Sequence, residues 1–200
     1  THDLVAGEDP QIEGATPEQI ERNKQPAVVK EGSNVTLDLN GHSVESKFNG
    51  SDALISATGT GTTLAITDPN SAPIYGGNGK LQASADEAGR SATWDNASRT
   101  LTYYVTDTLA LGESSVETCL VETVKAPDNA GMISGGSSTL VAGTNGSTIN
   151  IKGGIFNVNA KAINVAGSTF EMTGGYIVGC SVTGDNGAAI NAANSAVTIA

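Results

Sequence analysis

The last third of the chain, residues 130–200, repeats one short pattern, and this repetition limits the folds open to the chain. The pattern alternates polar and apolar residues, and its copies are Ser147–Ile151, Ser168–Met172 and Ser195–Ile199. The first two copies begin 21 residues apart (168 − 147). Repeats of about 20–30 residues are typical of solenoids, in which one unit cannot bury its apolar residues alone and stacks on its neighbours.

Two further patterns accompany each copy. A hydrophobic pair followed by a polar residue recurs as Met132-Ile133-Ser134, Ala162-Ile163-Asn164 and Ala189-Ile190-Asn191. Paired glycines recur as Gly153-Gly154 and Gly174-Gly175, and the whole order is repeated upstream by Leu54-Ile55-Ser56, Thr62–Ile66 and Gly76-Gly77. Each unit therefore predicts about three short strands, and nothing between them has an apolar stripe at helical spacing. We expect an all-β right-handed parallel β-helix, with Asn and Ser stacked as ladders at its corners.

The segment VTLDLNGHSV, residues 35–44, resembles the repeats of pectin-lyase-like β-helices in large bacterial cell-surface proteins. The units described above continue this resemblance over most of the chain. It implies the same right-handed parallel β-helix. The superfamily includes lyases, glycosidases, adhesins and phage tailspikes, so the resemblance implies a fold more narrowly than a function.

The pattern also predicts how the chain is divided. Residues 1–26 are expected to form an N-terminal cap with a short helix from Thr16, because Pro17 fits the first helical position and Gln19 completes a capping box. Residues 27–200 are expected to form the β-helix. Ile55 and Ile133 occupy the same place in the repeated pattern but lie 78 residues apart (133 − 55), whereas neighbouring copies are 27–30 residues apart. This difference predicts a lateral β insertion at about 75–129.

Within the insertion, a β-hairpin is expected from residues 92–94 and 100–105, followed by a strand over residues 115–124. The chain begins with Thr1-His2-Asp3, and its last unit stops before a third strand. We therefore expect the sequence to be a fragment of a longer protein with further rungs.

Composition narrows the classes of function. The 200 residues carry a formal net charge of −11 with only 10 Lys and Arg, which argues against binding nucleic acid or an anionic membrane face. No apolar run is long enough to span a membrane. The 25 glycines and 4% aromatic residues suit an extracellular β-solenoid, secreted or at the cell surface. Cys119 and Cys180 offer neither a disulfide framework nor a metal-ligand spacing, and Cys180 is expected to be a buried small apolar residue.

No catalytic residue is assigned. Polysaccharide lyases and glycosidases need clustered acidic and basic groups, whereas the rungs over 130–200 carry only four charged residues: Lys152, Lys161, Glu171 and Asp185. The insertion is the better candidate for binding. Its aromatic residues Trp94, Tyr103 and Tyr104 can stack on sugar rings, with Asp95 and Arg99 as polar neighbours. The competing interpretation is that these aromatic residues form the small core of the insertion itself.

Calcium is the one cofactor for which the sequence offers ligands. Asp185 and Asp68 each start a loop that supplies hard oxygen atoms. Each loop has too few carboxylates alone, and turn formation explains both loops equally well, so no resident cofactor is assigned.

The leading hypothesis for function is a non-catalytic, extracellular module of a bacterial surface protein, which resembles an adhesin or contacts carbohydrate on a glycan or host surface. Two alternatives stay open. One is part of a polysaccharide lyase or glycoside hydrolase whose catalytic rungs lie mostly outside this piece, and the other is a purely structural stalk.

Overall fold

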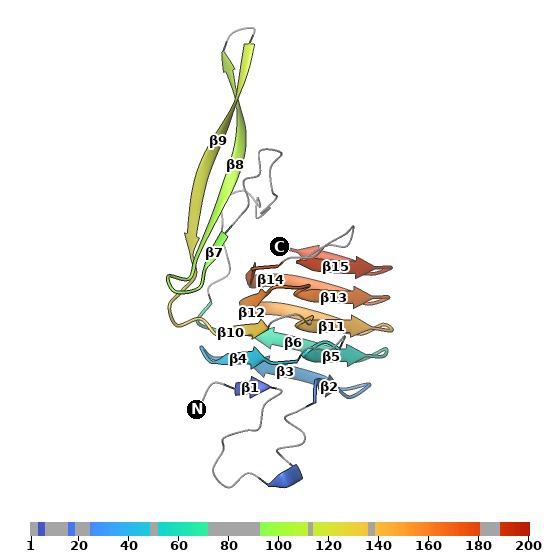
Figure 1. The fold of residues 1–200 in the computed structure, drawn as a ribbon. Helices are drawn as coiled ribbons and strands as arrows, with labels where there is room; N and C mark the ends of the chain where they lie inside the picture. The colour runs from blue at the N-terminus through green and yellow to red at the C-terminus, as the bar shows by residue number, and fades with distance from the viewer. Residues whose placement is uncertain are drawn as a thin grey trace. The chain divides into compact units, whose positions relative to one another are not determined.

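The fold is almost entirely β-strand (Figure 1). The computed structural model describes residues 4–6, 16–18, 25–48, 52–71, 93–111, 114–135, 139–180 and 189–200. The chain divides into two compact units: unit 1 comprises Thr1–Ile74 and Asn129–Ala200, and unit 2 comprises Tyr75–Asp128. Among the described residues only Pro17 and Glu18 are helical, at the start of the predicted helix; residues 19–24 of that helix lie outside the described part.

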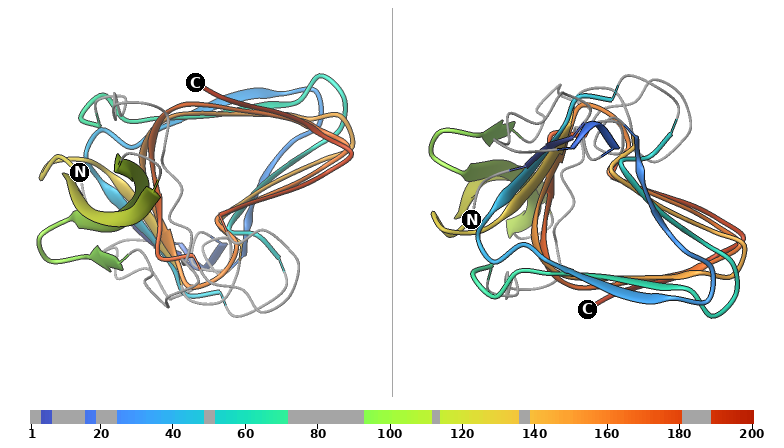
Figure 2. Two further views of the ribbon diagram at one scale, coloured as in Figure 1. Left: turned by 90° about the horizontal axis from the view of Figure 1, so that it is seen from above. Right: turned by 90° about the horizontal axis from the view of Figure 1, so that it is seen from below.

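Unit 1 contains two sheets, and every strand pair in it is parallel. The first, sheet A, is eight-stranded and comprises β1 (Leu4–Ala6), β3 (Asn34–Asp38), β4 (Ser43–Ser46), β6 (Thr63–Thr67), β10 (Met132–Gly135), β12 (Thr148–Val158), β14 (Thr169–Val178) and β16 (Ala196–Ile199). The second, sheet B, is five-stranded and comprises β2 (Ala27–Val29), β5 (Ile55–Thr58), β11 (Val141–Thr144), β13 (Ile163–Ala166) and β15 (Ile190–Ala193). From β10 onwards the chain passes alternately through the two sheets, and strands from successive passes overlie one another in Figure 2.

The core of unit 1 consists of columns of apolar side chains, one from each strand. The register places Leu64 beside Ile149, and Ile149 beside Phe170. These three side chains are at most 1% exposed. The burial of β6 and the first part of β12 alternates strictly between buried and partly exposed residues. The period-two pattern of the repeated units therefore reflects one face turned into the core.

The paired glycines bend the two longest strands of sheet A. Gly154 in β12 and Gly175 in β14 have positive φ angles of 94° and 93°. A Cβ atom on Gly175 would lie 2.6 Å from the carbonyl oxygen of Gly154. The β12–β14 pairing is irregular over this stretch, and β12 pairs with β6 before its glycines and with β10 after them. Glycine is therefore required here because a side chain would meet the backbone of the neighbouring strand.

Polar side chains at equivalent positions form hydrogen bonds between neighbouring strands and turns. The Ser147 and Ser168 hydroxyls, just before β12 and β14, lie 3.3 Å apart, and the Ser168 backbone N–H donates to the Ser195 hydroxyl at 3.1 Å. The predicted Ser ladder is therefore present at the corners, whereas the Asn ladder lies within sheet B: Asn191 of β15 donates its side-chain amide to the Asn164 side-chain oxygen of β13 at 2.7 Å. Stacking in register gives each of these polar groups a partner of its own kind.

The register corrects one part of the predicted repeat frame. Ile163 pairs with Val141 and Ile190, so the equivalent of the Ala162-Ile163-Asn164 unit is Leu140-Val141-Ala142. Met132-Ile133-Ser134 lies instead in sheet A, where Ile133 pairs with Phe156. The two triplets look alike in sequence because strands in both sheets use the same alternation, and only the pairing distinguishes them.

The strand predicted at residues 35–39 is present as β3, but its expected buried face is only partly formed. Leu39 is 2% exposed, whereas Val35 is 41% exposed. Among the described strands β3 pairs with β6 alone, so it lies at an edge of sheet A, and this position accounts for the exposure of Val35.

Unit 2 contains sheet C, which is antiparallel with the order β7-β8-β9. Its strands are β7 (Thr93–Asp95), β8 (Thr100–Leu111) and β9 (Ser114–Lys125). Both the predicted hairpin and the predicted third strand are confirmed. The turn between β7 and β8 includes Arg99 with a positive φ of 52°.

Cys180 is a free cysteine whose thiol should react slowly in the folded protein. Its S–H donates to the Val178 carbonyl oxygen at 3.6 Å, and burial raises the pKa of the thiol to about 11. In a Cys119→Ser variant, which leaves one thiol, we expect modification by a disulfide reagent at mildly alkaline pH to be about 100-fold slower than in the unfolded chain. Equal rates in the folded and unfolded chains would contradict this expectation.

Candidate functional site

The aromatic residues proposed as a sugar platform lie on two paired strands of sheet C. Trp94 pairs directly with Leu101, so the two residues share a face. Tyr103 and Tyr104 follow Leu101 along β8. Tyr103 pairs with Glu122, and Tyr104 pairs with Val121. The pairing of β7 with β8 therefore brings all three aromatic residues of the predicted set into one sheet.

Trp94 is partly buried, and the polar edge of its ring is covered. The indole N–H is buried and has no hydrogen-bond partner within the part of the chain that the structure describes. A buried donor without an acceptor costs about 1–3 kcal/mol, so it needs a structural or functional explanation. The neighbouring Leu101 is 9% exposed and provides an apolar contact surface on the same face.

Asp95 begins the tight turn that follows β7. Its carboxylate accepts the Ser98 hydroxyl at 2.7 Å and the Ala97 backbone N–H at 2.9 Å. These hydrogen bonds, the one from the Ser98 hydroxyl first, lower the pKa of Asp95 below its ordinary value. Asp95 is exposed and ionised near neutral pH, and in this structure it stabilises its own turn.

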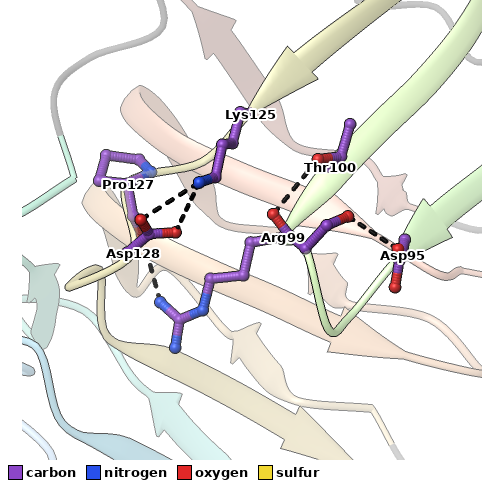
Figure 3. Close-up of polar contacts among 7 residues, drawn as sticks. Asp95, Arg99, Thr100, Lys125, Pro127 and Asp128 are labelled. Atoms are coloured by element: carbon purple, nitrogen blue, oxygen red, sulfur yellow. Dashed lines mark hydrogen bonds and ion pairs between the residues drawn. The ribbon is translucent and has the colours of Figure 1, made fainter.

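Arg99 is the last residue of the same turn, and it connects this turn to the residues that follow β9. Its guanidinium donates to the Pro127 carbonyl oxygen at 3.3 Å, and its own carbonyl oxygen accepts the Ala126 backbone N–H at 2.9 Å. Beside this pair, the Lys125 ammonium contacts both carboxylate oxygens of Asp128, at 3.0 and 3.2 Å (Figure 3). The charged side chains of Arg99, Lys125 and Asp128 therefore lie close to the end of β9.

A second polar cluster lies in unit 1 around Asp68, which is only 2% exposed. One carboxylate oxygen accepts the backbone N–H of Gly41 at 3.0 Å, and the other accepts that of Gly131 at 2.7 Å. Asn70 extends the cluster, because its side-chain oxygen accepts the Asn129 side-chain amide at 3.0 Å. The cluster therefore connects residues 68–70, which precede unit 2 in the chain, with residues 129–131, which follow it.

These contacts define what Asp68 does in the structure. Both of its oxygen atoms are directed at backbone donors, which is the arrangement of an anchor within the fold. The other candidate calcium ligand, Asp185, lies outside the described residues, and the residues that are described contain no group of three or more His, Cys, Asp or Glu side chains able to hold a metal ion. The anchoring role had no local signal in the sequence, because Gly41 and Gly131 lie 27 and 63 residues away from Asp68.

Comparison with protein-family models, with curated proteins and with solved structures found no match to this chain. In the described ranges, no helix has the length and apolar character needed to cross a membrane.

Proposed function

We propose that unit 1 is a right-handed parallel β-helix of the pectin-lyase-like type, interrupted by unit 2 as a lateral insertion. Three features support this proposal: all of its strand pairs are parallel, the chain alternates between two sheets from β10 onwards, and Ser side chains at turns and Asn side chains in strands form ladders at equivalent positions. A fold of this kind is stabilised by contacts between neighbouring turns and tolerates insertions on its side.

For function, we propose a non-catalytic, extracellular module of a bacterial surface protein that contacts glycan through unit 2. The observation that carries this proposal is the pair of Trp94 and Leu101 on one face of sheet C, with Tyr103 and Tyr104 next along β8. Aromatic and aliphatic residues gathered in one sheet suit the C–H face of a sugar ring, and the polar turn from Asp95 to Arg99 lies next to Trp94 in the chain. The strongly acidic composition favours neutral or cationic sugars over uronates, because like charges repel.

Trp94 is the only tryptophan of the chain, so its emission reports directly on this face. On titration with soluble neutral polysaccharides, we expect a saturable change in Trp94 fluorescence. Tyr103→Ala should weaken binding about tenfold, since one aromatic contact contributes roughly 1.5 kcal/mol. Because successive residues of a strand alternate between faces, we expect Tyr103, and not Tyr104, to share the face of Trp94. Tyr104→Ala is therefore the matched control, and it should bind as the unmodified chain does.

Circular dichroism of each variant shows whether sheet C is retained, and Tyr103→Phe, which keeps the ring, should bind almost normally. Equal losses in the Tyr103 and Tyr104 variants would contradict the proposed face. Absence of any saturable response across neutral, amino and acidic glycans would favour a structural stalk instead.

A further inference from the structure

In the described part of unit 1, two turns are formed by an asparagine followed by a glycine. Asn40-Gly41 lies between β3 and β4, and Asn145-Gly146 lies between β11 and β12. All four residues have positive φ angles, of 46° and 81° in the first pair and 56° and 85° in the second. Asparagine and glycine tolerate this conformation best, so the turn geometry accounts for both pairs. Gly41 is also fixed by packing, because a Cβ atom there would lie 2.8 Å from the Asn129 carbonyl oxygen.

An asparagine followed by a glycine is also a sequence at which a protein chain deamidates readily. The backbone nitrogen of the glycine loses its proton to a base in the solvent and attacks the side-chain carbonyl carbon of the asparagine. A carbon–nitrogen bond forms, and the side-chain amide nitrogen takes up a proton and leaves as ammonia. Water then opens the cyclic imide to aspartate or isoaspartate. Glycine favours the attack because it has no side chain to hinder its nitrogen.

The structure holds the reacting nitrogen of each pair in a hydrogen bond. The Gly41 N–H donates to a carboxylate oxygen of Asp68 at 3.0 Å, and the Gly146 N–H donates to the Gly167 carbonyl oxygen at 2.7 Å. Ring closure requires the nitrogen to lose its proton and to turn towards the asparagine side chain, so it cannot begin until the hydrogen bond opens. At Gly41 the acceptor is a carboxylate, and its charge also opposes the negative charge that forms on the nitrogen when the proton leaves.

The two pairs are protected by different kinds of acceptor. Gly167 offers a backbone oxygen, which no side-chain substitution removes. Asp68 offers a side chain, which is 2% exposed and whose other oxygen accepts the Gly131 N–H at 2.7 Å. We propose that Asp68 protects Asn40 from deamidation, and that Asn40-Gly41 becomes a site of this modification when the Asp68 contact is lost. The inference concerns unit 1 alone and is independent of glycan binding by unit 2.

Deamidation of Asn40 would in turn prevent the contact from forming again. Isoaspartate adds an atom to the backbone just before Gly41, and so displaces the N–H that Asp68 accepts. Either product also adds a negative charge next to the Asp38 carboxylate, which accepts the Asn40 backbone N–H at 3.2 Å. Like charges at this distance repel. An opening of the Asp68 contact is therefore converted into a lasting covalent change.

Peptide mapping by mass spectrometry, after incubation of the full chain at mildly alkaline pH, tests the proposal. The rate at each site is expressed relative to its rate in the urea-unfolded chain. In the folded, unmodified chain we expect both Asn40 and Asn145 to deamidate at least about tenfold more slowly than in the unfolded chain. Asp68→Ala should raise the rate at Asn40 by about tenfold or more and leave Asn145 unchanged, because a hydrogen bond to a charged acceptor is lost at one site only.

Phe170→Ala separates this effect from a general loss of stability. It leaves a cavity in the core of unit 1 but keeps the Asp68 contact, so the rates at Asn40 and Asn145 should change together. Where Asp68→Ala does not fold by circular dichroism, Asp68→Asn takes its place: it removes the charge that opposes proton loss, so Asn40 should again become faster relative to Asn145. Equal changes at the two sites in the Asp68 variants would overturn the proposal, as would an Asn40 rate that is the same in the folded and unfolded chains.

Discussion

Asp68→Ala is expected to destabilise unit 1 by about 3–5 kcal/mol. The carboxylate is buried and accepts backbone N–H groups from two segments, at Gly41 and Gly131. Its removal leaves the buried Gly131 N–H and the partly buried Gly41 N–H without their acceptor, and an unsatisfied buried donor costs about 1–3 kcal/mol. Urea unfolding followed by far-UV circular dichroism measures the loss.

Two further variants separate hydrogen bonding from charge. Asp68→Asn keeps one acceptor oxygen and loses the other, so it should be about half as damaging as alanine. Asp38→Ala is the matched control, because the Asp38 carboxylate is exposed and, within the described residues, accepts only the nearby Asn40 backbone N–H. Equal stabilities of the Asp68→Ala and Asp38→Ala variants would contradict the anchoring role.

Phe170→Ala is expected to cost about 3–5 kcal/mol as well, through a cavity in the core of unit 1. Phe170 is fully buried in β14, between Ile149 of β12 and Val197 of β16. Because strands on both sides hold their positions by backbone pairing, the neighbours cannot close the space completely. The midpoint of urea unfolding should fall without a change in its slope.

Val197→Ala provides the control for this prediction. Val197 belongs to the same column, but at the edge, where 43% of its surface is exposed. Its truncation should cost about 1 kcal/mol or less, because little surface is newly exposed. Similar losses from the Phe170 and Val197 variants would show that the column is not packed as the structure describes.

Trp94 emission makes it possible to follow the two units separately. Trp94 lies in unit 2, whereas both substitutions lie in unit 1. Circular dichroism reports mainly on the larger unit, so differences between the two transitions reveal whether the units unfold together.

Much of the local structure was predictable from the sequence. Alternation over Thr62–Ile66, Ser147–Ile151 and Ser168–Met172 identified strands whose pairing the structure confirms. The positive φ angles of Asn40 and Gly41 also follow from the sequence, because an Asn-Gly pair favours such a turn. The hairpin that carries Trp94, Tyr103 and Tyr104 was predictable as well, and the pairing of β7 with β8 confirms it.

Other features required the pairing of distant strands. The equivalence of Val141 with Ile163 could not be read from the sequence, since Ile133 lies in a triplet of the same form. The exposure of Val35 likewise depends on which strands lie beside β3 rather than on β3 itself.

The sequence by itself determined where the strands lie, because the choice of inward and outward residues is made within each strand by its own alternation. The tertiary structure alone decided which strands are neighbours, which apolar residues stand at an open edge, and which groups Asp68 joins. The physical reason is that these properties depend on contacts between residues tens of positions apart, such as the 63 that separate Asp68 from Gly131.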